Sequence, residues 1–309
     1  MIPLFNITNH TIALRDFDHH LHGSIVSHFE KKFCSYVGAK YGCALNSATS
    51  AIFLSLIKTK GVISIPSVLP AVVANAVVNS GNEINFVDDP TWVGGSYTLH
   101  NFGDYKIIDS AQRVDKNQFK EANPGDLMIF SFYPTKPVGG IDGGIVVSDD
   151  KEKIEWFKEA SMNGMSFSNN NWERQQSFPG WKMYMSSPQA FVALENLEKL
   201  EGKKKKLAHI RDHYNDIFGL HNTSHHLYRV NVEDRDNVVS GLKNQNITCG
   251  IHYNALHQSK VFKNDKALPL SEYDAETTMS LPFHEALTPQ DIKYIIQNVT
   301  LEGVDYDHT

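Results

Sequence analysis

The chain has 309 residues, 41% of them hydrophobic, and a formal net charge of −6 at pH 7. This length and apolar content allow one large domain and a smaller one, and the acidic balance argues against a nucleic-acid-binding surface. The sequence has no apolar run near the ~18 residues of a membrane span, and its first residues lack the basic and apolar regions of a secretory signal. The three cysteines show no CxxC spacing, so we expect a protein of the reducing cytoplasm.

The fifteen histidines are scattered along the chain. The pairs His19-His20 and His225-His226 have no matching acidic cluster, so a metal site is only weakly indicated.

Residues 24–37 carry apolar side chains at helical spacing, which predicts a helix that ends at Gly38. Residues 41–57 predict a short strand, a polar turn and an apolar helix, and the turn contains Ser47, Thr49 and Ser50. Small hydroxyl residues are common caps at a helix N-terminus. The same hydroxyls and the free backbone N–H groups also suit an anion, and the local sequence leaves both interpretations open.

Short strands are predicted at residues 62–66 and 84–88, with a helix at residues 69–79 between them. This alternation predicts right-handed strand–helix–strand units and a mainly parallel sheet flanked by helices. Residues 89–103 contain glycines and predict irregular structure.

The next predicted strand, residues 105–112, ends in a carboxylate and an amide, Asp109 and Gln112. The carboxyl ends of strands face the ligand crevice in open α/β sheets. Asp109 is therefore either a turn residue or a carboxylate that pairs with a protonated ring nitrogen.

Lys136 lies in a turn rich in glycine and proline, between apolar strands predicted at residues 127–130 and 144–148. Small residues around it would let the backbone approach a ligand closely. One interpretation is a solvated loop lysine, as most lysines are. The other is a lysine that forms a Schiff base with the aldehyde of pyridoxal phosphate (PLP).

Residues 151–163 predict a helix, and residues 164–183 a long polar loop of a kind that is often functional. Residues 187–220 predict a long amphipathic helix. We interpret the lysine run at 203–206 as a solvated face of that helix.

Shorter elements follow the long helix. Strands are predicted at 226–232 and 247–253 and a helix at 234–243; residues 278–281 and a last helix at 288–299 follow. They indicate a small α+β domain, so we place the boundary within the long helix, between a large domain at 1–205 and a small domain at 206–309.

Several motifs agree with a known family in order and spacing. They are an opening helix and phosphate turn in residues 28–57, the lysine loop at 130–144, and Gly250-Ile251-His252-Tyr253 and Leu281-Pro282-Phe283-His284 in residues 249–284. Over nearly the whole chain, the sequence resembles the PLP-dependent sugar aminotransferases of the DegT/DnrJ family, which are fold-type-I enzymes. The resemblance implies an α/β fold with a mainly parallel central sheet, a small C-terminal α+β domain, and a homodimer with shared active sites.

The resemblance also assigns roles to residues. Lys136 would hold the cofactor as a Schiff base and then move a proton between substrate and cofactor, and Asp109 would keep the pyridine ring protonated. Gln112 matches a family glutamine near the ring, and His252 and Tyr253 lie where the small domain of the family approaches the active site. The candidate cofactor-binding residues are Ser47, Thr49, Ser50, Asp109, Gln112, Ser131, Lys136 and Lys182.

The chain departs from the family in four places. Pro70 replaces an aromatic residue that covers the cofactor ring in many members, so ring binding is weaker or another residue such as Trp92 substitutes. The segment 180–185 lacks the usual asparagine and arginine, and Lys182 would meet a phosphate as a point charge. The stretch between Asp88 and Asp109 is shorter than in typical relatives, and Ala48 stands where glycine is usual.

The leading hypothesis is an enzyme that transfers an amino group from glutamate to a keto sugar, itself linked to a nucleotide, in a ping-pong reaction. One alternative is a PLP-dependent sugar dehydratase, against which Lys136 counts because those relatives carry histidine in its place. Another is a shortened relative that binds PLP or a sugar without turnover.

Overall fold

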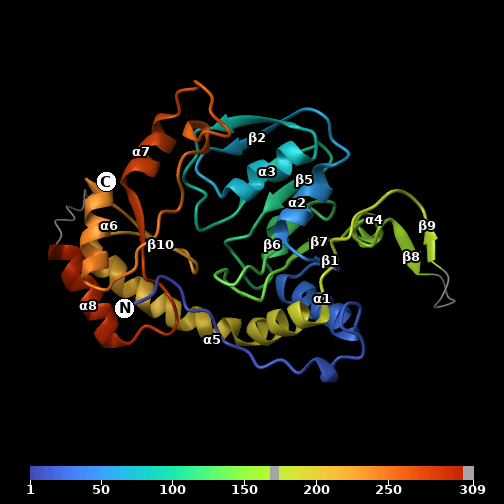
Figure 1. The fold of residues 1–309 in the computed structure, drawn as a ribbon, viewed down its shortest axis with the longest axis horizontal. Coiled ribbons are helices and arrows are strands. Elements are labelled where there is room, and N and C mark those ends of the chain that lie inside the picture. The colour runs from blue at the N-terminus through green and yellow to red at the C-terminus, as the bar shows by residue number, and fades with distance from the viewer. Residues whose placement is uncertain (168–173, 302–309) are drawn as a thin grey trace.

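The computed structural model describes residues 1–167 and 174–301. Helices cover a central sheet, and the long helix α5 leads from the sheet to a smaller group of elements near the C-terminus (Figure 1). The strands are β1 (Tyr41–Leu45), β2 (Val62–Pro66), β3 (Glu83–Val87), β4 (Tyr97–Asn101), β5 (Lys106–Asp109), β6 (Leu127–Ser131), β7 (Gly144–Ser148), β8 (Met165–Phe167), β9 (Arg174–Gln176), β10 (Tyr228–Asn231) and β11 (Thr278–Leu281).

The helices predicted from apolar periodicity are all found, with ends that differ by a few residues. The α-helices are α1 (Ser24–Val37), α2 (Ala48–Leu56), α3 (Ala71–Asn79), α4 (Lys151–Ser161), α5 (Ser187–Phe218), α6 (Arg235–Asn244), α7 (Pro269–Thr277) and α8 (Pro289–Leu301), and short 3-10 turns occur at Leu14–Asp16, Gln118–Glu121 and Leu256–Gln258. As expected, α1 ends at Gly38, which adopts a left-handed conformation with φ 81°.

The central sheet has the strand order β1-β7-β6-β5-β4, and β2 and β3 form a separate parallel pair. Within the central sheet β5 and β6 are parallel, whereas β1–β7, β6–β7 and β4–β5 are antiparallel. The α/β class is confirmed, but the expectation of a mainly parallel sheet is wrong. Residues 102–105 alone join β4 to β5, and residues 132–143, without a helix, join β6 to β7. Parallel neighbours need a longer crossover, usually through a helix.

Three strands of this sheet nevertheless point the same way. β5 is parallel to β6, and β1 and β6 are both antiparallel to β7. Their carboxyl ends, Leu45, Asp109 and Ser131, therefore lie at one edge, where Leu45 and Ser131 both pair with Gly144. The strand ends lie together because their place depends on strand direction and not on how neighbours pair; that they assemble the site stays a prediction.

The structure corrects three further expectations about local structure. Residues 89–103, predicted to be irregular, contain β4, whose pairing with β5 is interrupted between Thr98 and His100. The strand predicted at 247–253 does not form; this stretch makes only isolated bridges at Ile247 and Gly250 within the described chain. The predicted loop 164–183 contains the paired strands β8 and β9, which project from the body of the molecule (Figure 1), while its residues 168–173 lie outside the described residues.

Two apolar clusters lie on the two faces of the central sheet, because successive side chains of a strand point to opposite faces. Ile129 and Val146 belong to the cluster that contains α2 and α3, whereas Phe130 and Ile145 belong to the cluster that contains α1 and the first half of α5. A third cluster begins at Leu207 and continues through β10, β11 and α8. This separation supports the domain boundary near residue 205, which stays a prediction.

The lysine run at 203–206 is not a uniformly solvated face. Lys205 and Lys206 are exposed, but Lys203 and Lys204 are half-buried. Lys203 donates a hydrogen bond to the carbonyl oxygen of Pro137, and Lys204 pairs with Asp115. Among the described helices, none combines the length and the apolar character that crossing a membrane requires.

Candidate active site

The lysine loop connects β6 to β7 at the edge where the three strand ends meet. It begins with a tight turn in which the Lys136 amide donates to the carbonyl oxygen of Tyr133 at 2.9 Å. Its base is closed by a hydrogen bond of 2.8 Å from the Phe132 amide to the Gly143 carbonyl. Gly143 has φ 140°, which a residue with a side chain rarely adopts. The glycines of this loop are thus required by its backbone path.

Lys136 is half-buried. Burial lowers the pKa of its amine to about 8, and the carboxylate of Asp109 opposes this shift. A lowered pKa leaves a larger fraction of the amine neutral near pH 8, and the neutral amine is the form that attacks a carbonyl. The structure therefore favours the reactive interpretation of Lys136 over the solvated one.

Asp109 is the carboxyl-terminal residue of β5 and only 3% exposed. Its Oδ1 accepts a hydrogen bond of 2.9 Å from the Ala111 amide, and its Oδ2 accepts one of 3.1 Å from the Tyr97 hydroxyl. Burial raises the pKa of this carboxyl, while the two donors and the nearby Lys136 act in the opposite direction. A buried carboxylate in this position would stabilise the positive charge of a protonated ring nitrogen.

The N-terminus of α2 lies beside the lysine loop. The Ser47 hydroxyl caps this helix by accepting a hydrogen bond of 3.1 Å from the Ser50 amide, which confirms the capping interpretation. Gly144 is packed so closely that an added Cβ would lie 2.3 Å from the Ala48 nitrogen. Ser131 pairs with Gly144, so its hydroxyl, Thr49 and the first N–H groups of α2 belong to the same corner. Caps and anion sites are compatible, because the first N–H groups of a helix have no partner within it.

Gln112 is joined to the C-terminal part of the chain. Its Nε2 donates to the Tyr253 hydroxyl at 3.0 Å, and its Oε1 accepts from the Gly94 amide at 2.8 Å. Tyr253 of the motif His252-Tyr253 therefore contacts the candidate site. Burial, together with the charge of Lys136, lowers the pKa of the neighbouring His252 to about 4.

Sequence reasoning missed two residues of this region, Tyr97 and His226. His226 is 5% exposed, and burial together with Lys136 lowers the pKa of its imidazole well below the ordinary value. The sequence indicates it only as half of a weak metal-binding pair, and among the described residues no group of three potential metal ligands occurs. Tyr97 carried no signal, because its strand was not predicted.

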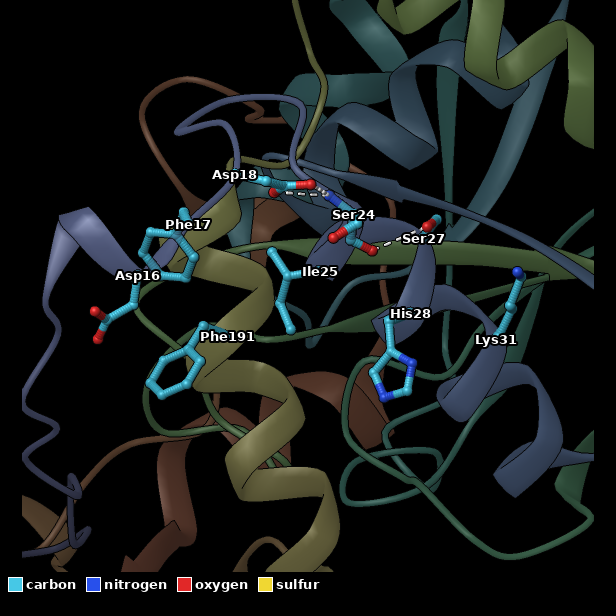
Figure 2. Close-up of a pocket in the computed structure, with 9 residues that line it drawn as sticks. All are labelled: Asp16, Phe17, Asp18, Ser24, Ile25, Ser27, His28, Lys31 and Phe191. Carbon is cyan, nitrogen blue, oxygen red and sulfur yellow. Dashed lines mark hydrogen bonds between the residues drawn. The ribbon is translucent and has the colours of Figure 1, made fainter.

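Lys182 is not brought to the Lys136 site by the contacts of this chain. It is exposed and lines a separate cavity of about 300 Å³ together with His22, Asn163 and Tyr184. Another cavity, of about 610 Å³, lies between the N-terminal segment, α1 and Phe191 of α5 (Figure 2). The rings of Phe17 and Phe191 make an edge-to-face contact at one side of this cavity, with centroids 5.9 Å apart. None of the predicted site residues lines the cavity.

The donor set at the sheet edge fits pyridoxal phosphate. Lys136 would supply the amine, Asp109 the buried carboxylate for the ring nitrogen, and the N-terminus of α2 a place for the phosphate. On an α/β fold of this kind, these groups are those of a PLP-dependent enzyme.

The comparison with known proteins identifies the family. The chain belongs to the DegT/DnrJ/EryC1/StrS aminotransferase family, which it matches over residues 6–92 and 107–300. The resemblance seen in the motifs, and with it the cofactor PLP, is confirmed. The match is interrupted at the stretch that looked shortened in the sequence.

Several individual proteins are similar over most of the chain. The spore coat polysaccharide biosynthesis protein SpsC of Bacillus subtilis is 27% identical, covering 92% of this chain and 91% of its own. A UDP-4-amino-4,6-dideoxy-N-acetyl-beta-L-altrosamine transaminase of Campylobacter jejuni is 25% identical over 88% of each chain. Among solved structures, the aminotransferase TlmJ of Streptoalloteichus hindustanus aligns with a TM-score of 0.83 at 20% identity over 98% of each chain. This structural likeness confirms the fold-type-I architecture.

Proposed function

We propose that the protein transfers an amino group from glutamate to the keto group of a nucleotide-linked sugar. The observation that carries the proposal is that Lys136, whose pKa burial lowers, and the buried carboxylate of Asp109 act on each other electrostatically at one sheet edge. The sugar is supported by the names of the relatives, one of which is a transaminase of a UDP-linked amino sugar. A dehydratase role is disfavoured, since a lysine occupies the position where those relatives carry histidine.

In this proposal the chain's own residues divide the work. When bound, PLP supplies a carbonyl that takes up the amino group and a ring that accepts the electron pair of the substrate carbon. Lys136 first holds the cofactor and then carries a proton between substrate and cofactor, which its pKa of about 8 allows in both directions near neutral pH. Asp109 would keep a proton on the ring nitrogen, and Gln112, held by Tyr253 and Gly94, would contact the cofactor.

The phosphate is proposed to lie at the N-terminus of α2. Thr49 and Ser131 would donate hydroxyl hydrogen bonds to it. Ser50 serves the cap instead, because its hydroxyl donates to Oδ1 of Asn46 at 2.7 Å and its amide donates to the Ser47 hydroxyl.

We propose further that two copies form a homodimer with shared sites. Lys182 is exposed on its own chain, which leaves its amine available to the phosphate of the other copy. The test mixes Lys136→Ala with Lys182→Ala subunits, each inactive alone. Restored activity in the mixture, up to about a quarter of the wild-type value for random pairing, supports sharing. No restoration, with dimers present, overturns it.

Spectra of the purified protein test the proposed function. Visible absorbance with PLP that is absent in Lys136→Ala supports attachment at this lysine, and a colourless wild-type protein after PLP addition contradicts it. Conversion of bound PLP to pyridoxamine phosphate by glutamate supports transamination. A spectrum that no amino donor changes favours the alternative of binding without turnover. A panel of nucleotide-linked keto sugars then identifies the acceptor.

A further inference from the structure

Residues 92–97 lie where the chain departs from its family, because the family match ends at residue 92 and resumes at residue 107. In the structure this segment makes a turn and enters β4. Tyr97, the first residue of β4, pairs directly with Asp109, the last residue of β5. The open end of the β4–β5 hairpin therefore lies at the candidate active site.

Tyr97 touches the proposed ring-nitrogen partner. Its hydroxyl donates to Oδ2 of Asp109 at 3.1 Å, while the Ala111 amide donates to Oδ1 at 2.9 Å. Each carboxylate oxygen thus has one donor, and together they set the plane of the group. The other titratable groups that act on Asp109 are Lys136 from the lysine loop and Tyr253 from the C-terminal part of the chain.

The same segment holds Gln112. The Gly94 amide donates to Oε1 of Gln112 at 2.8 Å, and Gly94 has φ 89°, a conformation suited to glycine. Trp92 packs against the rings of both Tyr97, which binds Asp109, and Tyr253, which binds Gln112. Its ring centroid lies 4.7 Å from that of Tyr97 and 6.5 Å from that of Tyr253, the latter nearly parallel with an interplanar angle of 5°.

We propose that segment 92–97 positions the active site in place of the family segment that this chain lacks, and that Tyr97 is a positioning residue that keeps the Asp109 carboxylate ionised and oriented toward the cofactor ring. A hydrogen-bond donor stabilises the charged form of a buried carboxylate. The inference rests on the proposed function, since it requires PLP at this site.

The test compares Tyr97→Phe with Tyr105→Phe, a matched loss of one hydroxyl at the opposite end of the same hairpin. PLP affinity of the apoproteins is measured by absorbance titration between pH 5.5 and 9 (about the range in which a raised carboxyl and Lys136 titrate). Tyr97→Phe is expected to bind PLP about tenfold more weakly at pH 7. The fall in its PLP affinity at low pH should begin at a higher pH than in the wild type, because the Asp109 carboxyl that has lost a donor is protonated more easily. Tyr105→Phe should match the wild type.

A double-mutant cycle separates positioning from general packing. In an Asp109→Asn background, Tyr97→Phe should cause no further loss of PLP affinity. An equal loss of PLP affinity in both backgrounds overturns the inference, and so does a Tyr97→Phe variant that binds PLP as Tyr105→Phe does. In either case, PLP binding by the wild type leaves the proposed function intact. A wild type that does not bind PLP overturns the proposed function itself. The melting temperatures of all apoproteins are measured alongside the cycle. A folding defect of Tyr97→Phe would lower the melting temperature in both backgrounds.

Discussion

The amine of Lys203 on α5 donates a hydrogen bond of 3.1 Å to the carbonyl oxygen of Pro137, the residue after the candidate cofactor lysine. Two turns earlier on the same helix, Asn196 donates 3.1 Å to the carbonyl oxygen of Gly139. Residues at this spacing share one face of a helix. Two side chains of α5 therefore hydrogen-bond to the backbone that follows Lys136. Lys203 also approaches the carboxylate of Glu285 at 3.9 Å, which connects the loop to the last part of the chain.

Replacing Lys203 by Met should loosen this attachment. The Pro137 carbonyl loses its donor, so we expect a loss of about 1 kcal/mol in the free energy of unfolding, seen as a melting temperature lower by about 2–4 °C. Lys205→Met changes an exposed lysine of the same run and should stay within about 0.5 kcal/mol of the wild type. Equal melting temperatures for the two variants would contradict the role of Lys203.

The rate at which PLP attaches to the apoprotein should depend on pH with a midpoint near 8. Burial lowers the pKa of Lys136 to about 8, and only the neutral amine attacks the aldehyde. The Asp109 carboxylate works against this shift, so Asp109→Asn should move the midpoint to lower pH. Stopped-flow absorbance between pH 6 and 11 (about the span of buried and ordinary lysines) measures both. A wild-type midpoint near the ordinary value of 10.5 would sink the prediction.

Asp109→Asn should reduce turnover by about a hundredfold without lowering stability at neutral pH. Burial raises the pKa of Asp109 in the folded state. The group therefore contributes stability at low pH that is lost as pH rises through its folded pKa. A neutral amide avoids that loss, so the variant should melt at or above the wild-type temperature at pH 7. Steady-state kinetics and thermal unfolding test this, and parallel losses of both quantities would mean that Asp109 is structural.

Gly144→Ala should destabilise the corner where the phosphate is proposed to bind. An added Cβ would lie 2.3 Å from the backbone nitrogen of Ala48, and backbone cannot move aside cheaply. We expect a loss of about 3 kcal/mol, at the upper end for overpacked sites. The control Gly202→Ala lies in the interior of α5 with open space around it and should gain about 1 kcal/mol from helix propensity. Denaturant unfolding measures both, and a stable Gly144→Ala protein would show that the corner can relax.

Local patterns predicted much of this structure. The helices carry apolar side chains at a regular period, and the lysine loop is bounded by two apolar strands, so each is encoded over a few residues. Whether a strand forms, and in which direction it pairs, depends on its partner strand and surroundings more than on its own residues. For this reason the mainly parallel sheet, the irregular character of residues 89–103 and the strand at 247–253 were all predicted wrongly.

By itself, the sequence determined the elements and the chemistry that they carry: an amine in a glycine-rich loop, a carboxylate at a strand end and hydroxyl residues at a helix N-terminus. These follow from neighbouring residues, because turns, caps and strand ends are local. Only the tertiary structure decided which groups surround that chemistry. The contact of Tyr97 with Asp109 depends on β4 pairing with β5, and the burial that lowers the pKa of Lys136 to about 8 exists only once the sheet edge, α2 and the C-terminal segment have closed around the loop.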